Sequence, residues 1–208
     1  MSKPMTVASL QMISTPDVER NLDIAQRLIG QAAKLGARMV LLPEYFCLMG
    51  QKDTDKLAIA EQFGHGPIQQ FLADQAVVRN VHIVAGTLPI SSGVDGRVYN
   101  TTLVFDPQGQ CTARYDKIHL FCFTKGQESY DEARVLLPGT KPVVADVDGF
   151  KIGLSVCYDL RFPELYRAMG KVDLIVMPAA FTYTTGRAHW EVLMRARAIE
   201  NQCYVLAC

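Results

Sequence analysis

Short, wholly apolar runs constrain the fold of this chain more than any other feature of its sequence. Met39–Leu42 contains no polar residue, and Ile83–Gly86 is a second run of this kind. Such runs are typical of strands buried on both faces, as in a parallel sheet covered by helices. Segments with helical periodicity separate them: Ser14–Pro16 is a cap-and-proline start for a helix that ends near Gly36, and Pro67 starts the next helix. The chain therefore alternates buried strands with helices.

The later part of the chain adds antiparallel hairpins to this alternation. Asp148-Gly149 is a typical two-residue hairpin turn. Hairpins among parallel-type strands predict an α/β fold with mixed sheets covered by helices. Ile118–Pro142 shows no periodic pattern, and a loop of that length inside a compact domain is usually functional. The remaining expected elements are strands Val98–Phe105, Cys111–Lys117, Val143–Val147 and Phe150–Val156, helix Pro163–Met169, strand Leu174–Met177, helix His189–Asn201 and strand Cys203–Ala207.

Composition limits the function to a few classes. The 208 residues suit a single domain, residues 1–208, without a linker, internal repeat or low-complexity tract. Lys plus Arg and Asp plus Glu number 21 each, which argues against nucleic-acid binding because such proteins usually carry a basic excess. No apolar run reaches the ~20 residues of a membrane span, and the N-terminus lacks the apolar core of a signal peptide. The six cysteines show neither a disulfide framework nor metal-ligand spacing, so we expect reduced thiols in a cytoplasmic protein with a small-molecule substrate and no metal or cofactor.

Three reactive side chains each follow the end of an expected strand: Glu44, Lys117 and Cys157. Ligands of open α/β sheets bind beyond the carboxyl ends of the strands, so these three side chains can converge. A cysteine attacks as the thiolate and needs a base or a cation nearby. Glu44 can take the thiol proton, and Lys117 can lower the cysteine pKa and stabilise an oxyanion together with the Tyr158 amide.

Each of these residues also has a more ordinary interpretation. Taken alone, Glu44 is a loop carboxylate, Lys117 a solvated charge and Cys157 a small buried apolar residue. A papain-like Cys–His pair with His119 or His189 is a further alternative. We rank it lower because His119 lies two residues beyond the better-placed lysine and His189 opens an amphipathic helix, so a core or capping role is favoured for both.

Three segments resemble the signature motifs of the nitrilase (carbon–nitrogen hydrolase) superfamily. Leu41–Glu44, Tyr115–Phe121 and Gly153–Leu165 match them in order and spacing, and the similarity extends from the first strand to the last residue. The resemblance implies a four-layer α-β-β-α sandwich with mixed sheets. It also implies a general base, a transition-state lysine and an acyl-accepting nucleophile, which are Glu44, Lys117 and Cys157.

The resemblance extends to further site residues. Many family members use a second glutamate seven residues before the glycine of a Pro-Gly pair, so Pro138-Gly139 selects Glu132 over Glu128. We expect Asp159 and Arg161 to hold the turn after the nucleophile through charge-assisted hydrogen bonds. The substrate-binding candidates are Tyr158, Arg161, Phe181, Thr184 and Thr185.

Within the superfamily, the chain looks most like the branch that contains deaminated glutathione amidase and omega-amidase. The expected reaction cleaves a small carboxylate-bearing amide, similar to deaminated glutathione, through a cysteine thioester with release of ammonia. Arg187 and Arg161 are the cations available for the carboxylate. The alternatives are a nitrilase, an N-carbamoyl amino acid hydrolase, and a truncated non-catalytic member that acts as a binding protein. The chain ends at Cys208, before the family's usual C-terminus, and the resemblance implies a homodimer or larger homo-oligomer.

Overall fold

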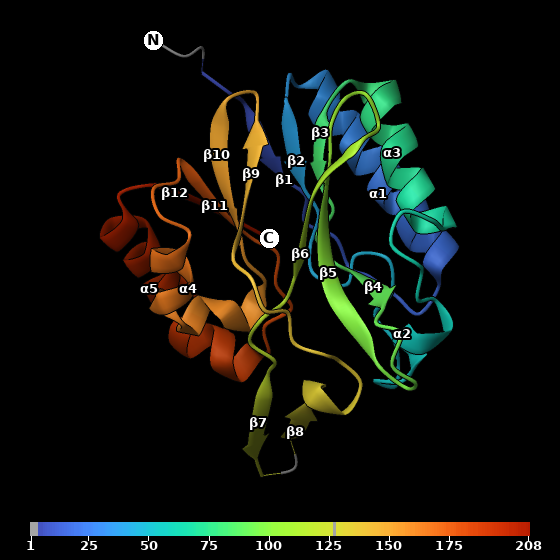
Figure 1. Cartoon of the computed structure of the whole chain (residues 1–208), viewed down its shortest axis with the longest axis vertical. Helices are drawn as coiled ribbons and strands as arrows, with labels where there is room; N and C mark the ends of the chain where they lie inside the picture. Colours follow the sequence, from blue (N-terminus) through green and yellow to red (C-terminus); the bar gives the residue numbers. More distant parts are fainter. Residues whose placement is uncertain (1–3, 127) are drawn as a thin grey trace.

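The protein has four layers, with two stacked sheets between two layers of helices (Figure 1). The computed structural model describes residues 4–126 and 128–208. The expected α-β-β-α arrangement with mixed sheets is therefore confirmed. None of the helices in this described part is both long and apolar enough to cross a membrane.

The six-stranded sheet is formed by the first half of the chain. Its strands run in the order β1-β2-β3-β5-β4, and β6 also pairs with β5. The first three strands are parallel to one another, whereas β5 is antiparallel to its neighbours. Two helices cover its outer face, α1 (Val18–Lys34) and α3 (Pro67–Arg79), and a short helix α2 (Asp55–Ala58) lies in a connection. The strands are β1 (Val7–Ser9), β2 (Met39–Leu41), β3 (His82–Val84), β4 (Leu88–Ser91), β5 (Val98–Phe105) and β6 (Cys111–Asp116).

The four-stranded sheet is formed by the second half of the chain, in the order β12-β11-β10-β9. Asp148 and Gly149 have φ of 52° and 86°, the left-handed conformation that the expected hairpin turn requires. Helices α4 (Pro163–Ala168) and α5 (Tyr183–Asn201) cover its outer face. Its strands are β9 (Val143–Val147), β10 (Phe150–Leu154), β11 (Leu174–Met177) and β12 (Tyr204–Ala207).

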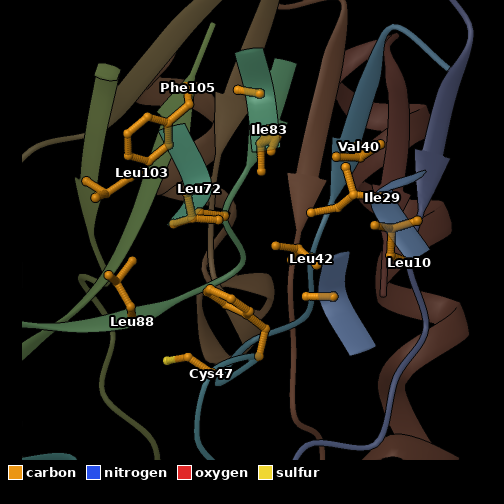
Figure 2. Close-up of a cluster of buried hydrophobic side chains, with 14 of the residues drawn as sticks. Leu10, Ile29, Val40, Leu42, Cys47, Leu72, Ile83, Leu88, Leu103 and Phe105 are labelled. Carbon is orange, nitrogen blue, oxygen red and sulfur yellow. The ribbon is translucent and has the colours of Figure 1, made fainter. Parts of the chain in front are cut away.

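The apolar run at β2 is explained by burial on both of its faces. Val40 and Leu42 belong to the core between the six-stranded sheet and its helices, where Figure 2 shows them beside Ile29 of α1. Met39 and Leu41 alternate with them and belong to the core that includes the facing sheet. Because successive strand residues point to opposite faces, a strand with a core on each side must be apolar throughout.

Several expected boundaries are wrong. Asp17 caps α1, accepting a hydrogen bond of 3.1 Å from the Arg20 amide, so Ser14–Pro16 precedes the cap. Helix α5 begins at Tyr183, six residues before the expected start, because the Thr182 side chain caps it. Helix α2 and strand β4 were not predicted from the sequence.

The segment Ile118–Pro142 is not a plain loop. It contains a hairpin, β7 (Cys122–Lys125) and β8 (Glu128–Asp131), followed by the 3-10 helix η1 (Glu132–Arg134). The hairpin projects away from the two large sheets (Figure 1). Short exposed strands of this kind bury little apolar surface and so leave no clear pattern in the sequence.

Candidate active site

Glu44 lies in the turn after β2, and the close approach of a second loop fixes that turn. Gly86 has φ of +53°, and a Cβ at this position would lie 2.0 Å from the Pro43 carbonyl oxygen, so only glycine fits. The neighbouring Thr87 hydroxyl accepts a hydrogen bond of 2.8 Å from the Tyr45 amide. These contacts hold the Glu44 carboxylate in the interior, with 3% of the residue exposed.

Lys117 directly follows β6 and is completely buried. Its Nζ lies 3.0 Å from Glu44 Oε1 and 2.8 Å from Glu132 Oε2. The backbone behind it is held by Gly139, whose amide donates to the Lys117 carbonyl at 2.8 Å. A Cβ on Gly139 would lie 2.0 Å from the Asp116 carbonyl oxygen, which explains why a glycine follows Pro138. The two carboxylate partners offset the large free-energy cost of burying the lysine charge.

Glu132 is the first residue of η1, directly after the β7–β8 hairpin. This position brings its carboxylate to Lys117. Its carboxylate also accepts hydrogen bonds from the Tyr45 hydroxyl at 2.9 Å and from the Phe121 amide at 2.7 Å. The structure thus brings Glu132 together with Glu44 and Lys117. The alternative residue, Glu128, belongs to β8, and its side chain lies outside the described part of the protein.

Cys157 begins the 3-10 helix η2 (Cys157–Arg161), three residues after Leu154, the last residue of β10. Its φ of 47° is unusual for a residue with a side chain, and strained backbone of this kind is often found at functional sites. The thiol lies against the Glu44 carboxylate, which also accepts a hydrogen bond of 2.8 Å from the Ala180 amide. The next amide, that of Tyr158, has no hydrogen-bond acceptor among the described residues and is free to bind an oxyanion.

The comparisons with known proteins agree with this site. The family model for carbon–nitrogen hydrolases matches residues 6–208. The chain belongs to the carbon–nitrogen hydrolase family. It is 43% identical to a deaminated glutathione amidase from Synechocystis, over 99% of this chain and 77% of that protein.

Two solved structures show the same family resemblance. The NitFhit protein of C. elegans is 35% identical with a TM-score of 0.87, over 99% of this chain and 52% of that one. An amidase from Nesterenkonia sp., in a crystal structure that shows acrylamide added to its active-site cysteine, is 28% identical with a TM-score of 0.81, over 99% of this chain and 79% of that one. The chain therefore spans about half to four fifths of these relatives, and it is a hydrolase of carbon–nitrogen bonds with amidases among its relatives.

The charges at this hydrolase site differ from those of a thiolate–cation pair. Burial raises the pKa of Cys157 well above its ordinary value, and the Glu44 carboxylate raises it further, while Lys117 acts in the opposite direction. Lys117 does act to lower the cysteine pKa, as expected, but burial and the nearby carboxylate outweigh it, so the net pKa is raised. The resting site holds a neutral thiol beside a potential proton acceptor.

The pKa values of the two glutamates are shifted in opposite directions. Burial raises the pKa of Glu44, although the neighbouring Lys117 opposes the rise. The pKa of Glu132 is lowered despite its burial, because Lys117 attracts the ionised form and donates to it. Burial by itself lowers the pKa of Lys117, but the two carboxylates together raise it and keep the lysine protonated. Pairs of titratable groups whose pKa values are moved apart are typical of acid–base sites.

Two cavities meet at the site. A narrow pocket of about 10 Å³ holds Cys157, and a larger cavity of about 730 Å³ holds Glu44 and Glu132. Both are lined by Phe121 and by residues 180–182. Among the expected substrate-binding residues, Thr184 lines neither, because α5 turns its neighbour Thr185 inward instead. The expected residues that line the narrow pocket are Tyr158, Arg161, Phe181 and Thr185.

Asp159 holds the turn after Cys157, but Arg161 does not. The Asp159 carboxylate accepts hydrogen bonds from the Val156 amide at 2.9 Å and from the His119 amide at 3.0 Å. Arg161 instead lies over the rings of Tyr158 and Phe181, at 5.7 and 5.4 Å from their centroids. Its guanidinium has no carboxylate partner among the described residues, which leaves it free to bind an anion.

The other cations and histidines considered from the sequence lie elsewhere. Arg187 is an exposed residue of α5 that lines neither cavity. His119 pairs with Asp159 at 2.7 Å and stacks on Phe162, so it is a packed structural residue. His189 is exposed in the middle of α5, so its expected core or capping role is wrong.

Sequence reasoning missed two residues that position Glu44 and Glu132. Asn100 of β5 is buried and donates a hydrogen bond of 3.0 Å to Glu44 Oε1. Its presence inside a predicted strand was the available signal, since a buried amide needs partners. Tyr45 next to Glu44 gave no signal of its contact with Glu132. Within residues 4–126 and 128–208, no three His, Cys, Asp or Glu side chains are grouped to hold a metal ion.

Proposed function

We propose that this protein hydrolyses a small amide through a thioester on Cys157. The observation that supports the proposal is the meeting of a buried thiol, two carboxylates and a protonated lysine at one point. We infer that residues 1–208 act as one carbon–nitrogen hydrolase domain. In this proposal Glu44 is the general base, Cys157 the nucleophile, and Lys117 an oxyanion donor that Glu132 positions.

The first half-reaction forms the thioester. Glu44 takes the proton of the Cys157 thiol as the sulfur attacks the amide carbon, so no free thiolate accumulates. The carbonyl oxygen becomes an oxyanion, which the Lys117 ammonium and the Tyr158 amide stabilise. Glu44 then gives the proton to the nitrogen as the carbon–nitrogen bond breaks and the amine leaves.

The second half-reaction releases the acid. A water molecule gives a proton to Glu44 while its oxygen attacks the thioester carbonyl, and the same donors stabilise the second oxyanion. When the carbon–sulfur bond breaks, the sulfur recovers the proton from Glu44. Glu132 stays ionised throughout, because its lowered pKa favours the carboxylate that pairs with Lys117.

We propose a carboxylate-bearing substrate, with deaminated glutathione first and α-ketoglutaramate second. The Arg161 guanidinium beside Cys157 has no carboxylate partner among the described side chains, which supports an acidic acyl group. The name of the Synechocystis relative supports the first choice. The expected release of ammonia applies only to a primary amide, because deaminated glutathione is a secondary amide and releases an amine.

The test is a panel of four substrates. We expect the highest kcat/KM for deaminated glutathione or α-ketoglutaramate, measured by the release of α-ketoglutarate. A simple nitrile and an N-carbamoyl amino acid are the comparison substrates for the nitrilase and carbamoylase alternatives. If either comparison substrate gives the highest kcat/KM, the amidase proposal is wrong. If none of the four is hydrolysed, the binding-protein alternative is favoured.

We further propose a cytoplasmic homodimer or larger homo-oligomer. All six cysteines are free thiols in the structure, which agrees with a reducing compartment. Large apolar side chains are exposed along α5 and on the edge strand β12, and exposed apolar surface often marks an interface. These residues are Tyr183, Val192, Ile199 and Tyr204.

A further inference from the structure

A lysine on the wall of the larger cavity has only a weak charged partner among the described side chains. Lys56 of α2 has a side chain that is only 18% exposed, yet its Nζ lies 3.8 Å from Asp53, a carboxylate that is itself 66% exposed. A contact of this length to an exposed residue is weak. The Lys56 ammonium is instead held 4.8 Å above the centre of the Tyr45 ring. It is thus a positioned cation facing a cavity.

Tyr45 connects this lysine to the reacting groups. The Lys56 ammonium lies over the face of the Tyr45 ring, and the Tyr45 hydroxyl donates a hydrogen bond of 2.9 Å to Glu132. Its own backbone is held at φ of 57° next to Glu44. The Tyr45 side chain therefore links Lys56 to Glu132, the carboxylate that pairs with Lys117.

The two cavities distinguish the two halves of a substrate. Cys157, which takes the acyl group, lines the narrow pocket together with Arg161. Glu44, which must reach the leaving nitrogen to protonate it, lines the larger cavity together with Lys56. The narrow pocket has room for about one water molecule, so an amide with its carbonyl carbon at the sulfur can direct only a small acidic terminus toward Arg161, and its amine lies in the larger cavity that Lys56 lines.

We propose that Lys56 is a specificity-determining residue that binds a carboxylate carried by the leaving amine. This inference rests on the proposed amidase function and adds a second recognition point to it. The substrates favoured by this arrangement carry an acidic group on each side of the amide, one for Arg161 and one for Lys56. A partly buried ammonium binds a carboxylate more strongly than an exposed one, because water screens it less.

The experiment uses three amides that share one acidic acyl group. The first is the primary amide, the second carries an amine that ends in a carboxylate, and the third carries the same amine with a carboxamide in place of the carboxylate. Lys56→Gln is compared with wild type on all three. Lys52→Gln is the matched control, because Lys52 is an exposed lysine beside the same cavity.

We expect Lys56→Gln to lower kcat/KM at least about 10-fold for the second amide, mainly through a higher KM, and to change the other two less than twofold. An equal loss on all three amides would mean that Lys56 only supports Tyr45 and would overturn the proposal. No loss on the second amide, or a loss with Lys52→Gln in its place, overturns it as well. If wild type hydrolyses none of the three, the proposed amidase function itself has failed.

Discussion

The Tyr115 hydroxyl donates a hydrogen bond of 2.7 Å to Asp159 Oδ2 and thereby joins the two segments that carry Lys117 and Cys157. Tyr115 is in β6, two residues before the lysine, and Asp159 is in η2, two residues after the cysteine. Both side chains are fully buried. The distance between the lysine and the thiol therefore depends on a hydrogen bond that neither residue makes itself.

Tyr115→Phe should loosen this connection. It leaves a buried carboxylate with one donor fewer, which costs on the order of 1–3 kcal/mol of unfolding free energy. We expect a lower urea midpoint and a kcat reduced several-fold. Tyr166→Phe is the matched control, because the buried Tyr166 hydroxyl has no partner among the described residues and its loss should be nearly neutral. Equal effects of the two substitutions would contradict the role of the Tyr115–Asp159 hydrogen bond.

Cys157→Ala should abolish hydrolysis while the thermal unfolding midpoint changes little, because the thiol contributes little packing. Cys157→Ser should be nearly as inactive, since a hydroxyl ionises far less readily than a thiol. Turnover and circular dichroism of each purified variant provide the measurement. Cys47→Ala serves as the control for a buried cysteine outside the site, and burial raises the pKa of that thiol to about 12. An alanine variant at position 157 with more than a small percentage of wild-type activity would end the thioester proposal.

The pH profile should show an acid limb that belongs to Glu44. Burial raises the pKa of this carboxyl above its ordinary 4.5, so as the pH falls it gains a proton earlier than a free glutamate does. A protonated Glu44 cannot accept the thiol proton, and kcat/KM should fall with it. We expect the apparent pKa of the limb to lie above the ordinary glutamate value in a kcat/KM titration. A limb at or below that value contradicts the assignment of Glu44 as the base.

Glu132→Gln should reduce kcat on the order of 10²-fold or more, because it weakens the hold on Lys117, an oxyanion donor, and loss of one such donor costs on the order of 10²–10³ in kcat. The amide removes one of the two charges that hold Lys117, and it changes the partner of the Tyr45 hydroxyl. Glu128→Gln, in strand β8 just before η1, is the control and should be close to silent. Steady-state kinetics of both variants decides between the two glutamates, and the reverse pattern would show that the wrong one was chosen.

The proposed homo-oligomer should depend on α5. Ile199 is 76% exposed on this helix, and Ile199→Glu places a charge in the proposed interface. We expect light scattering to show a dimer or larger species for wild type and a smaller one for the variant. Val78→Glu is the matched control on α3, where the valine is 69% exposed on the opposite outer layer. A monodisperse wild-type monomer rules out the oligomer.

The strands and motif positions were largely predictable, because they follow local rules. β5, β9 and β11 have the predicted bounds, since each is bracketed by clear turn or strand-end signals. The β7–β8 hairpin was not predictable, because its exposed strands carry no burial pattern. Glu132 was selected through a Pro-Gly pair, and the structure supplies the physical reason for that pair: Gly139 lets the chain pass against the Asp116 carbonyl.

The sequence by itself determined which reactive residues follow the strands, because strand period and burial pattern are properties of neighbouring residues. It also determined the family, through motifs whose order and spacing a single chain displays. Only the tertiary structure decided that burial keeps the Cys157 thiol neutral and that Lys56 faces the cavity. It also decided that Arg161 lies over the aromatic rings of Tyr158 and Phe181 instead of forming hydrogen bonds that hold the turn. These properties depend on desolvation and on distances between groups far apart in the chain, such as the Ala180 amide and Glu44, which are separated by 136 positions.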